Sequence, residues 1–149
     1  MIYIGADHRG FELKQKLVAH LTAEGLAVRD LGNTHHDPED DYVDFALKVA
    51  EQVKKDEGSK GILICGSGVG VDTVANKVSG IRSALVIDAA RAIQSRQHED
   101  INILSLPADI IDEDRAHQIV MAYLTTDFSG EERHMRRLEK MKQVEDRKL

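Results

Sequence analysis

The most informative segment of this chain is Ile62-Leu63-Ile64-Cys65-Gly66-Ser67-Gly68-Val69-Gly70-Val71-Asp72. Residues 61–65 are its most apolar strand candidate, and a run of this length is consistent with a buried strand. Three glycines then follow within five residues, which predicts a sharp turn into a helix. A buried strand that ends in such a turn is typical of a parallel α/β sheet, where ligands bind beyond the carboxyl ends of the strands.

Strand and helix patterns alternate on both sides of this segment. Apolar runs predict strands at 2–6, 27–31, 61–65, 83–87 and 101–106. Helical spacing predicts a helix that Gly25 closes, a helix after the glycine turn, and helices over 42–55, 89–98, 112–124 and 131–145. The alternation predicts a single-domain α/β protein with a doubly wound, five-stranded parallel sheet. We expect a flavodoxin-like strand order and a Rossmann-type α/β/α sandwich.

Length, charge and cysteine content narrow the class of protein. The 149 residues fit one domain, 1–149, and a net charge of −6 argues against a nucleic-acid partner. No apolar run approaches the roughly 18 residues that cross a bilayer, so no membrane partner is expected. The single cysteine cannot form an internal disulfide and suits a reducing compartment. We therefore expect a cytoplasmic protein.

The C-terminal helix, 131–147, carries an apolar stripe although no strand follows it. The stripe consists of Met135, Leu138, Met141 and Val144. An amphipathic helix at the end of a chain often packs on another subunit, so the stripe predicts a dimer interface.

The glycine-rich turn combines a thiol, a hydroxyl and converging backbone N–H groups. Such a nest binds anions, and it can stabilise an enediolate while a thiolate at Cys65 moves a proton. A buried, inert cysteine is the alternative. A phosphatase-type loop is excluded because Val71 stands where arginine is required. A dinucleotide fingerprint with Gly66, Gly68 and Asp88 stays open, although Val71 occupies its third glycine position.

Three further clusters carry groups that can bind or ionise. Asp7 and His8 follow the first strand and can contact sugar hydroxyls or phosphate, or can simply cap the next helix. His98 ends a helix, and Arg133 and Arg137 lie four residues apart on another. Each of these also fits an ordinary charged surface. The run His35-His36-Asp37 matches no strong metal-ligand spacing, so no metal is expected.

These segments together resemble the type B ribose-5-phosphate isomerase family, which includes galactose-6-phosphate isomerase subunits. The resemblance extends over nearly the whole chain. Its anchors are Gly5-Ala6-Asp7-His8, Gly10, Leu13-Lys14, Asp41-Tyr42, 61–70, Ala75-Asn76-Lys77, Gly80-Ile81-Arg82, Ser95-Arg96 with His98, Gly130, Arg133-His134 and Arg137.

The resemblance implies a homodimer or tetramer with shared active sites, a sugar-phosphate substrate and no metal or organic cofactor. It implies that Cys65 is the base that interconverts ribose 5-phosphate and ribulose 5-phosphate through a cis-enediolate. It also makes Ser67 and His98 catalytic, with His98 supplied by the partner subunit for ring opening. The implied substrate contacts are Asp7, His8, Tyr42, Gly66, Gly68, Val69, Gly70, Glu99, Arg133 and Arg137.

Two residues depart from the family pattern. Glu99 stands where relatives commonly have asparagine, and Asp109 where they often have a phosphate-binding arginine that Arg9, Arg96 or Arg136 can replace. These changes leave open a preference for a four- or six-carbon sugar phosphate. A non-catalytic module that binds a sugar phosphate or a nucleotide is a further alternative.

Overall fold

Five parallel strands form one sheet in the computed structural model, which describes residues 1–147. The strands are β1 (Ile2–Ala6), β2 (Val28–Asp30), β3 (Lys60–Cys65), β4 (Ser83–Leu85) and β5 (Ile103–Pro107). The helices are α1 (Phe11–Ala23), α2 (Tyr42–Lys55), α3 (Val69–Ala75), α4 (Ala89–Glu99), α5 (Glu113–Thr125) and α6 (Glu132–Glu145). Within the described residues, no helix is long and apolar enough to span a membrane.

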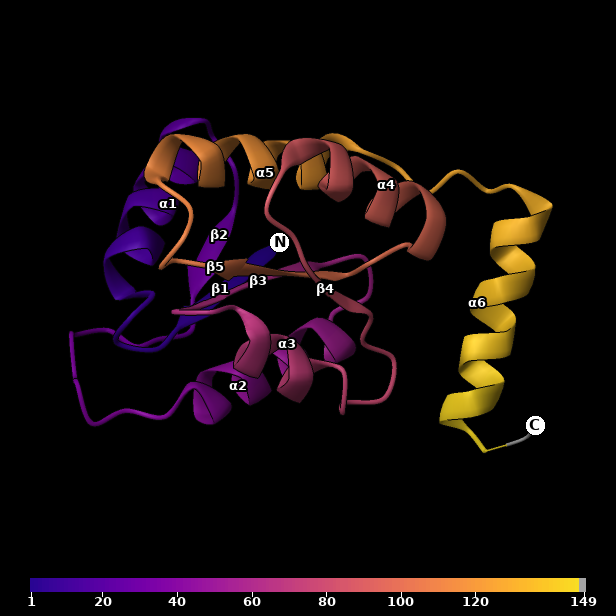
Figure 1. Ribbon diagram of the computed structural model, residues 1–149, viewed down its shortest axis with the longest axis horizontal. Helices are drawn as coiled ribbons and strands as arrows, with labels where there is room; N and C mark the ends of the chain where they lie inside the picture. Colours follow the sequence, from indigo (N-terminus) through magenta and orange to yellow (C-terminus); the bar gives the residue numbers. More distant parts are fainter. Residues whose placement is uncertain (148–149) are drawn as a thin grey trace.

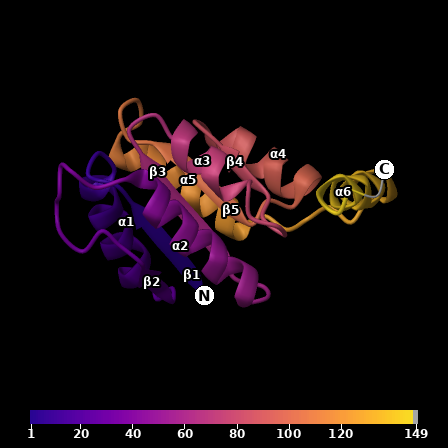
Figure 2. The ribbon, with the colours of Figure 1, turned by 90° about the horizontal axis from the view of Figure 1, so that it is seen from below.

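Helices cover both faces of the sheet, as the sequence predicts. Figures 1 and 2 show α1, α4 and α5 on one face and α2 with α3 on the other. Two apolar cores result, one on each face of the central strands. The doubly wound α/β class is therefore confirmed.

The strand order is β2-β1-β3-β5-β4, so the last two strands are exchanged relative to the flavodoxin order. All residues of β5 are buried, whereas the three residues of β4 are only partly buried. A strand at the centre of the sheet needs apolar residues on both faces, and the apolar β5 therefore pairs with β3. The short β4 is the edge strand of the sheet.

β1 and β3 are neighbours, as the sequence predicts, with Ala6 opposite Ile64 at their carboxyl ends. The loops that follow these two strands consequently meet. Gly68 ends the β3 loop with φ +74°, and a Cβ there would lie 2.5 Å from Leu85 Cδ1. Only glycine suits both the left-handed backbone and the close approach.

α6 stands apart from the sandwich. Figure 1 shows it beyond the end of α4, joined to α5 by an extended segment, and Figure 2 shows it nearly end-on. His134 is its buried residue, whereas Met135, Met141 and Val144 are exposed. The helix expected over 131–147 is thus observed as Glu132–Glu145, and residues 148–149 of the expected domain lie outside the described residues.

A buried lysine ties α1 to β2. Lys14 has no exposed side-chain surface, and its Nζ lies 2.5 Å from Asp30 Oδ2 and 2.7 Å from the Asn33 carbonyl oxygen. A buried ammonium group is tolerated only when paired in this way.

We expect Lys14→Ala to lower the free energy of unfolding by about 3 kcal/mol, because it leaves the Asp30 carboxylate without its cation. Urea unfolding followed by circular dichroism measures the change. Lys16→Ala is the matched control, since Lys16 is 54% exposed and lies 3.5 Å from Glu113. Its loss should cost about 0.5 kcal/mol or less. Equal losses in the two variants would contradict this account of Lys14.

Candidate active site

Three loops converge at the carboxyl edge of the sheet, after β1, β3 and β5. The loop after β5 is hydrogen-bonded to the end of β3: Ala108 N–H donates to the Cys65 carbonyl oxygen, and Asp109 N–H donates to that of Gly66, both at 2.9 Å. These bonds continue the sheet pairing past the last residue of β3. The thiol therefore sits on a rigid scaffold rather than on a free loop.

Cys65 lies at the base of this edge with 4% of its surface exposed. The Gly68 N–H donates a hydrogen bond to its Sγ at 3.1 Å. Ser67 is exposed, and its hydroxyl accepts a hydrogen bond from Val69 N–H at 3.2 Å. An N–H donor aimed at the sulfur stabilises negative charge there, as a thiolate base requires.

Asp7 holds the turn between β1 and α1. Its Oδ1 accepts hydrogen bonds from the backbone N–H groups of Arg9 at 3.0 Å and Gly10 at 3.1 Å, and the residue is 5% exposed. Asp7 therefore holds the turn before α1, but it does not cap the helix: Gly10 is the N-cap residue, and no side chain caps this end. The carboxylate also lies beside the β3 loop, since β1 and β3 are paired.

His8 pairs with an acid that the sequence analysis missed. Its Nδ1 lies 2.8 Å from Asp40 Oδ1, and its backbone N–H donates to the same oxygen at 3.0 Å. The hydrogen bond with Asp40 raises the pKa of His8 and thus favours the cationic ring. Burial alone raises the pKa of Asp40, but hydrogen bonds from His8 and Asn33 outweigh it and lower that pKa. Asp40 belongs to an acidic run typical of a helix start, so only its contact reveals its role.

Among the described residues, one cluster has the side-chain nitrogen and oxygen atoms that metals bind. It consists of Asp7, His8 and Asp40, whose candidate ligand atoms lie within 4.8 Å of one another. Hydrogen bonds among the protein groups account for each of these side chains. His35 and His36, which suggested a metal in the sequence, are exposed residues of the loop before α2.

Tyr42, the first residue of α2, lies against the glycine-rich loop. A Cβ on Gly70 would lie 2.7 Å from the Tyr42 ring, so the ring packs directly on the backbone of that loop. The side chain stays partly exposed at 39%. The structure thus brings the expected residues Asp7, His8, Tyr42, Cys65 and 66–70 together at one edge.

The remaining expected residues lie at the other end of the sheet. α4 starts after the carboxyl end of β4 and ends before the amino end of β5, which carries His98 and Glu99 away from Cys65. The start of α6 is beside them, because the His134 ring is 4.4 Å from the His98 ring. Arg133 and Arg137 belong to the same helix. One chain therefore holds two half-sites.

His134, which the sequence analysis named as an anchor of the family resemblance without giving it a role, also belongs to this second half-site. It is 2% exposed, and its Nδ1 lies 2.6 Å from Ser129 Oγ. Burial lowers the pKa of His134, and nearby His98 lowers it further, so a neutral ring is favoured there. The tilted stacking gives His98 a fixed, uncharged neighbour.

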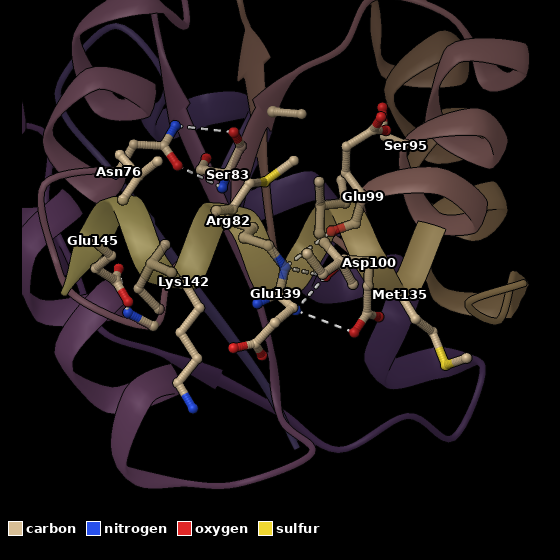
Figure 3. A pocket seen from close by; sticks show the side chains of 17 residues that line it. Asn76, Arg82, Ser83, Ser95, Glu99, Asp100, Met135, Glu139, Lys142 and Glu145 are labelled. Carbon is tan, nitrogen blue, oxygen red and sulfur yellow. Dashed lines mark hydrogen bonds and ion pairs between the residues drawn. The ribbon is translucent and has the colours of Figure 1, made fainter. Parts of the chain in front are cut away.

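A groove of about 940 Å³ lies near this second half-site, not at Cys65. Figure 3 shows α6 side chains, among them Met135 and Lys142, facing Arg82, Glu99 and Asp100 across it. Arg82 Nη2 donates to Asp100 Oδ2 at 3.1 Å and fixes one wall. The groove is the space that α6 leaves by standing away from the sandwich.

A doubly wound sheet with a thiol and a glycine-rich loop at its carboxyl edge is typical of an α/β enzyme domain. The chain belongs to the ribose/galactose isomerase family, whose model matches residues 2–141. It is 44% identical to the probable ribose-5-phosphate isomerase B of Mycoplasma pneumoniae, over 94% of this chain and 91% of that protein. It is 40% identical to ribose-5-phosphate isomerase B of Escherichia coli, over 99% and 97%.

Comparison with solved structures points to the same family. Ribose-5-phosphate isomerase B from Mycoplasma genitalium with bound ribulose-5-phosphate superposes with a TM-score of 0.93 at 42% identity, covering 97% of this chain and 95% of that one. The Clostridium thermocellum ribose-5-phosphate isomerase B has the same TM-score, 0.93, at 43% identity, covering 98% and 97%. The family expected from the sequence is confirmed.

We expect Asp40→Asn to move the pKa of His8 down toward its ordinary value of 6.5, because the hydrogen bond to a carboxylate is lost. A raised histidine pKa stabilises the fold at low pH, and that contribution is lost as pH rises through the folded value. The lowered pKa of the Asp40 carboxyl stabilises the folded protein at pH values above the ordinary carboxyl pKa of 3.8. The stability gap between wild type and variant should therefore be widest from about pH 4 to 6.5.

NMR titration of the His8 ring measures the first effect, and urea unfolding at several pH values measures the second. Glu39→Gln is the control, because Glu39 is exposed and next to Asp40 in the chain. A His8 midpoint that moves equally in both variants would show that general charge, not the contact, sets it.

Proposed function

We propose that this chain is an aldose–ketose isomerase that converts ribose 5-phosphate to ribulose 5-phosphate. The observation that carries the proposal is the hydrogen bond from Gly68 N–H to Cys65 Sγ, at 3.1 Å, in a loop at the carboxyl edge of the sheet. Relatives of 37% to 44% identity that carry the name ribose-5-phosphate isomerase B support the substrate.

The proposed reaction is a proton transfer between neighbouring carbons. The Cys65 thiolate takes the proton from C2 of the open-chain aldose, and the electron pair of the C–H bond forms the C1–C2 double bond of the cis-enediolate. A proton passes from O2 to O1, and the thiol delivers a proton to C1 as the C2 carbonyl forms. Negative charge develops on the substrate oxygens during this step. The backbone of 66–70 and the Ser67 hydroxyl are the donors proposed to stabilise it.

The proposed site is shared between two subunits. Cys65 and His98 lie at opposite ends of the sheet in one chain, whereas ring opening and proton transfer act on the same sugar. A two-fold axis that brings the α4–α6 end of one subunit to the carboxyl edge of its partner unites them. The exposed Met135, Met141 and Val144 supply apolar area for this contact. We propose a homodimer, with a tetramer as its doubled form.

Phosphate binding is assigned to cations from both half-sites. The hydrogen bond with Asp40 raises the pKa of His8 and so favours its cationic form. Arg133 and Arg137 are four residues apart on α6, so they lie on one face of it. Arg133 is held by Glu131 Oε2, 2.8 Å from its Nε. The partner subunit would contribute both arginines, and Glu99 would face the sugar from the same side.

A thiol base and backbone donors supply the proposed chemistry without a metal or organic cofactor. The thiol must stay reduced to act as a base, which fits the cytoplasm. The sugar phosphate is the proposed small-molecule partner.

The decisive experiment follows isomerisation of ribose 5-phosphate in deuterated water. Ribulose 5-phosphate should appear with deuterium at C1, and recovered ribose 5-phosphate should carry deuterium at C2, because the thiol exchanges its proton with solvent between the two transfers. A non-catalytic sugar-phosphate or nucleotide module would bind ligand without either signal. Isomerisation of only four- or six-carbon sugar phosphates would keep the mechanism and change the substrate.

We expect Cys65→Ala to reduce kcat by about 10³-fold or more, because no other group in the loop can accept the carbon-bound proton. Cys65→Ser keeps the shape of the side chain but is a far weaker base, so it should be nearly as inactive. Circular dichroism and thermal unfolding serve as the control for folding. Wild-type turnover by either variant would remove Cys65 from the mechanism.

Mixing two inactive variants tests whether the site is shared. Cys65→Ala and His98→Ala proteins, unfolded and refolded together, form mixed dimers in which one site regains both residues. Because half of randomly paired dimers are mixed, we expect about a quarter of the wild-type rate. Each variant refolded alone is the control. A mixture no more active than its components would place both residues in one subunit's site.

A further inference from the structure

An ion pair lies over the backbone of the glycine-rich loop at Gly66. Arg9 Nη2 donates to Asp109 Oδ2, and the two side chains come from the loops after β1 and β5. A Cβ placed on Gly66 would lie 2.6 Å from Arg9 Nε and 2.9 Å from Asp109 Oδ2. Both charged groups therefore lie directly over the backbone of the loop that follows Cys65.

Backbone hydrogen bonds hold Asp109 in this place. Its N–H donates to the Gly66 carbonyl oxygen at 2.9 Å, so the acid moves with the loop. Arg9 is held less tightly: its side chain is 57% exposed, against 39% for Asp109. Asp109 is thus the fixed member of the pair, and Arg9 is the member able to move.

The pair lies beside the loop after Cys65, where the substrate is proposed to bind. His8 precedes Arg9 in the chain. The hydrogen bond to Asp40 is the chief cause that raises the pKa of His8, and the Arg9 charge opposes it. A phosphate monoester carries about −1.5 to −2 charges at pH 7. Arg9 has five N–H donors that match phosphate oxygens, whereas the Asp109 carboxylate repels them.

We propose that Arg9 and Asp109 determine the affinity of the site for the phosphate group of its substrate, with Asp109 restraining Arg9 and cancelling its charge. This inference rests on the proposed function. Arg9 acts as a phosphate contact whose strength Asp109 reduces. The site consequently binds a sugar phosphate less tightly than its cations alone would allow, which favours release of the product.

The test is a double-mutant cycle on the full-length protein, with inorganic phosphate as the probe. Asp109→Asn should tighten phosphate binding, and lower the KM for ribose 5-phosphate, about fivefold, because it removes a negative charge and frees Arg9. Arg9→Gln should weaken both by about the same factor. In the Arg9→Gln background, Asp109→Asn should tighten binding by less than about twofold, because Asp109 acts largely through Arg9 and the two changes are therefore not additive.

The effect should fall on KM and not on kcat, because neither residue contacts the thiol. Glu57→Gln is the control for net charge: Glu57 is exposed and precedes the amino end of β3. Weaker phosphate binding by Asp109→Asn, or a change equal to that of the control, would overturn the inference.

Calorimetric titration with inorganic phosphate needs no turnover, so it separates this inference from the proposed function. If the variants shift phosphate affinity as expected and no sugar phosphate is isomerised, only the function is wrong. If ribose 5-phosphate is isomerised and phosphate affinity stays level across the cycle, only the inference is wrong.

Discussion

The hydrogen bonds that carry the sheet past the end of β3 are the constraint on which the site depends. Ala108 and Asp109 donate to the carbonyl oxygens of Cys65 and Gly66, and they hold the glycine-rich loop against the turn after β5. Without them, the Gly68 N–H would not stay directed at the thiol. The position of the thiol, the loop and the ion pair above it all follow from this extension of parallel pairing.

This constraint also explains why β5 lies inside the sheet, between β3 and β4. Its turn must reach the end of β3, which is possible only when the two strands are neighbours. Its fully buried residues suit that position, because helices cover both faces there. The strand order and the geometry of the site are thus two consequences of one pairing.

Charge is arranged differently at the two half-sites. At the carboxyl edge each cation has an acidic neighbour: His8 pairs with Asp40, and Arg9 with Asp109. On α6, positive charge is more concentrated, with Arg133, Arg136 and Arg137 within five residues. In the proposed shared site, the sheet would therefore position its groups through ion pairs, and α6 would supply most of the positive charge for the phosphate.

The sequence by itself determined the α/β class, the family, and the order of the elements with their boundaries to within about two residues. Apolar runs, glycine positions and helical spacing are local properties that each segment carries alone. Only the tertiary structure decided the exchange of β4 and β5, the pairing of Asp40 with His8 and that of Arg9 with Asp109. Asp40 and Asp109 are separated from their partners by 32 and 100 residues, and a lone acid in a loop gives no sign of which cation it will meet. The local patterns did not reveal the two half-sites, because their separation depends on which end of the sheet each helix reaches; only the family resemblance implied that His98 comes from the partner subunit.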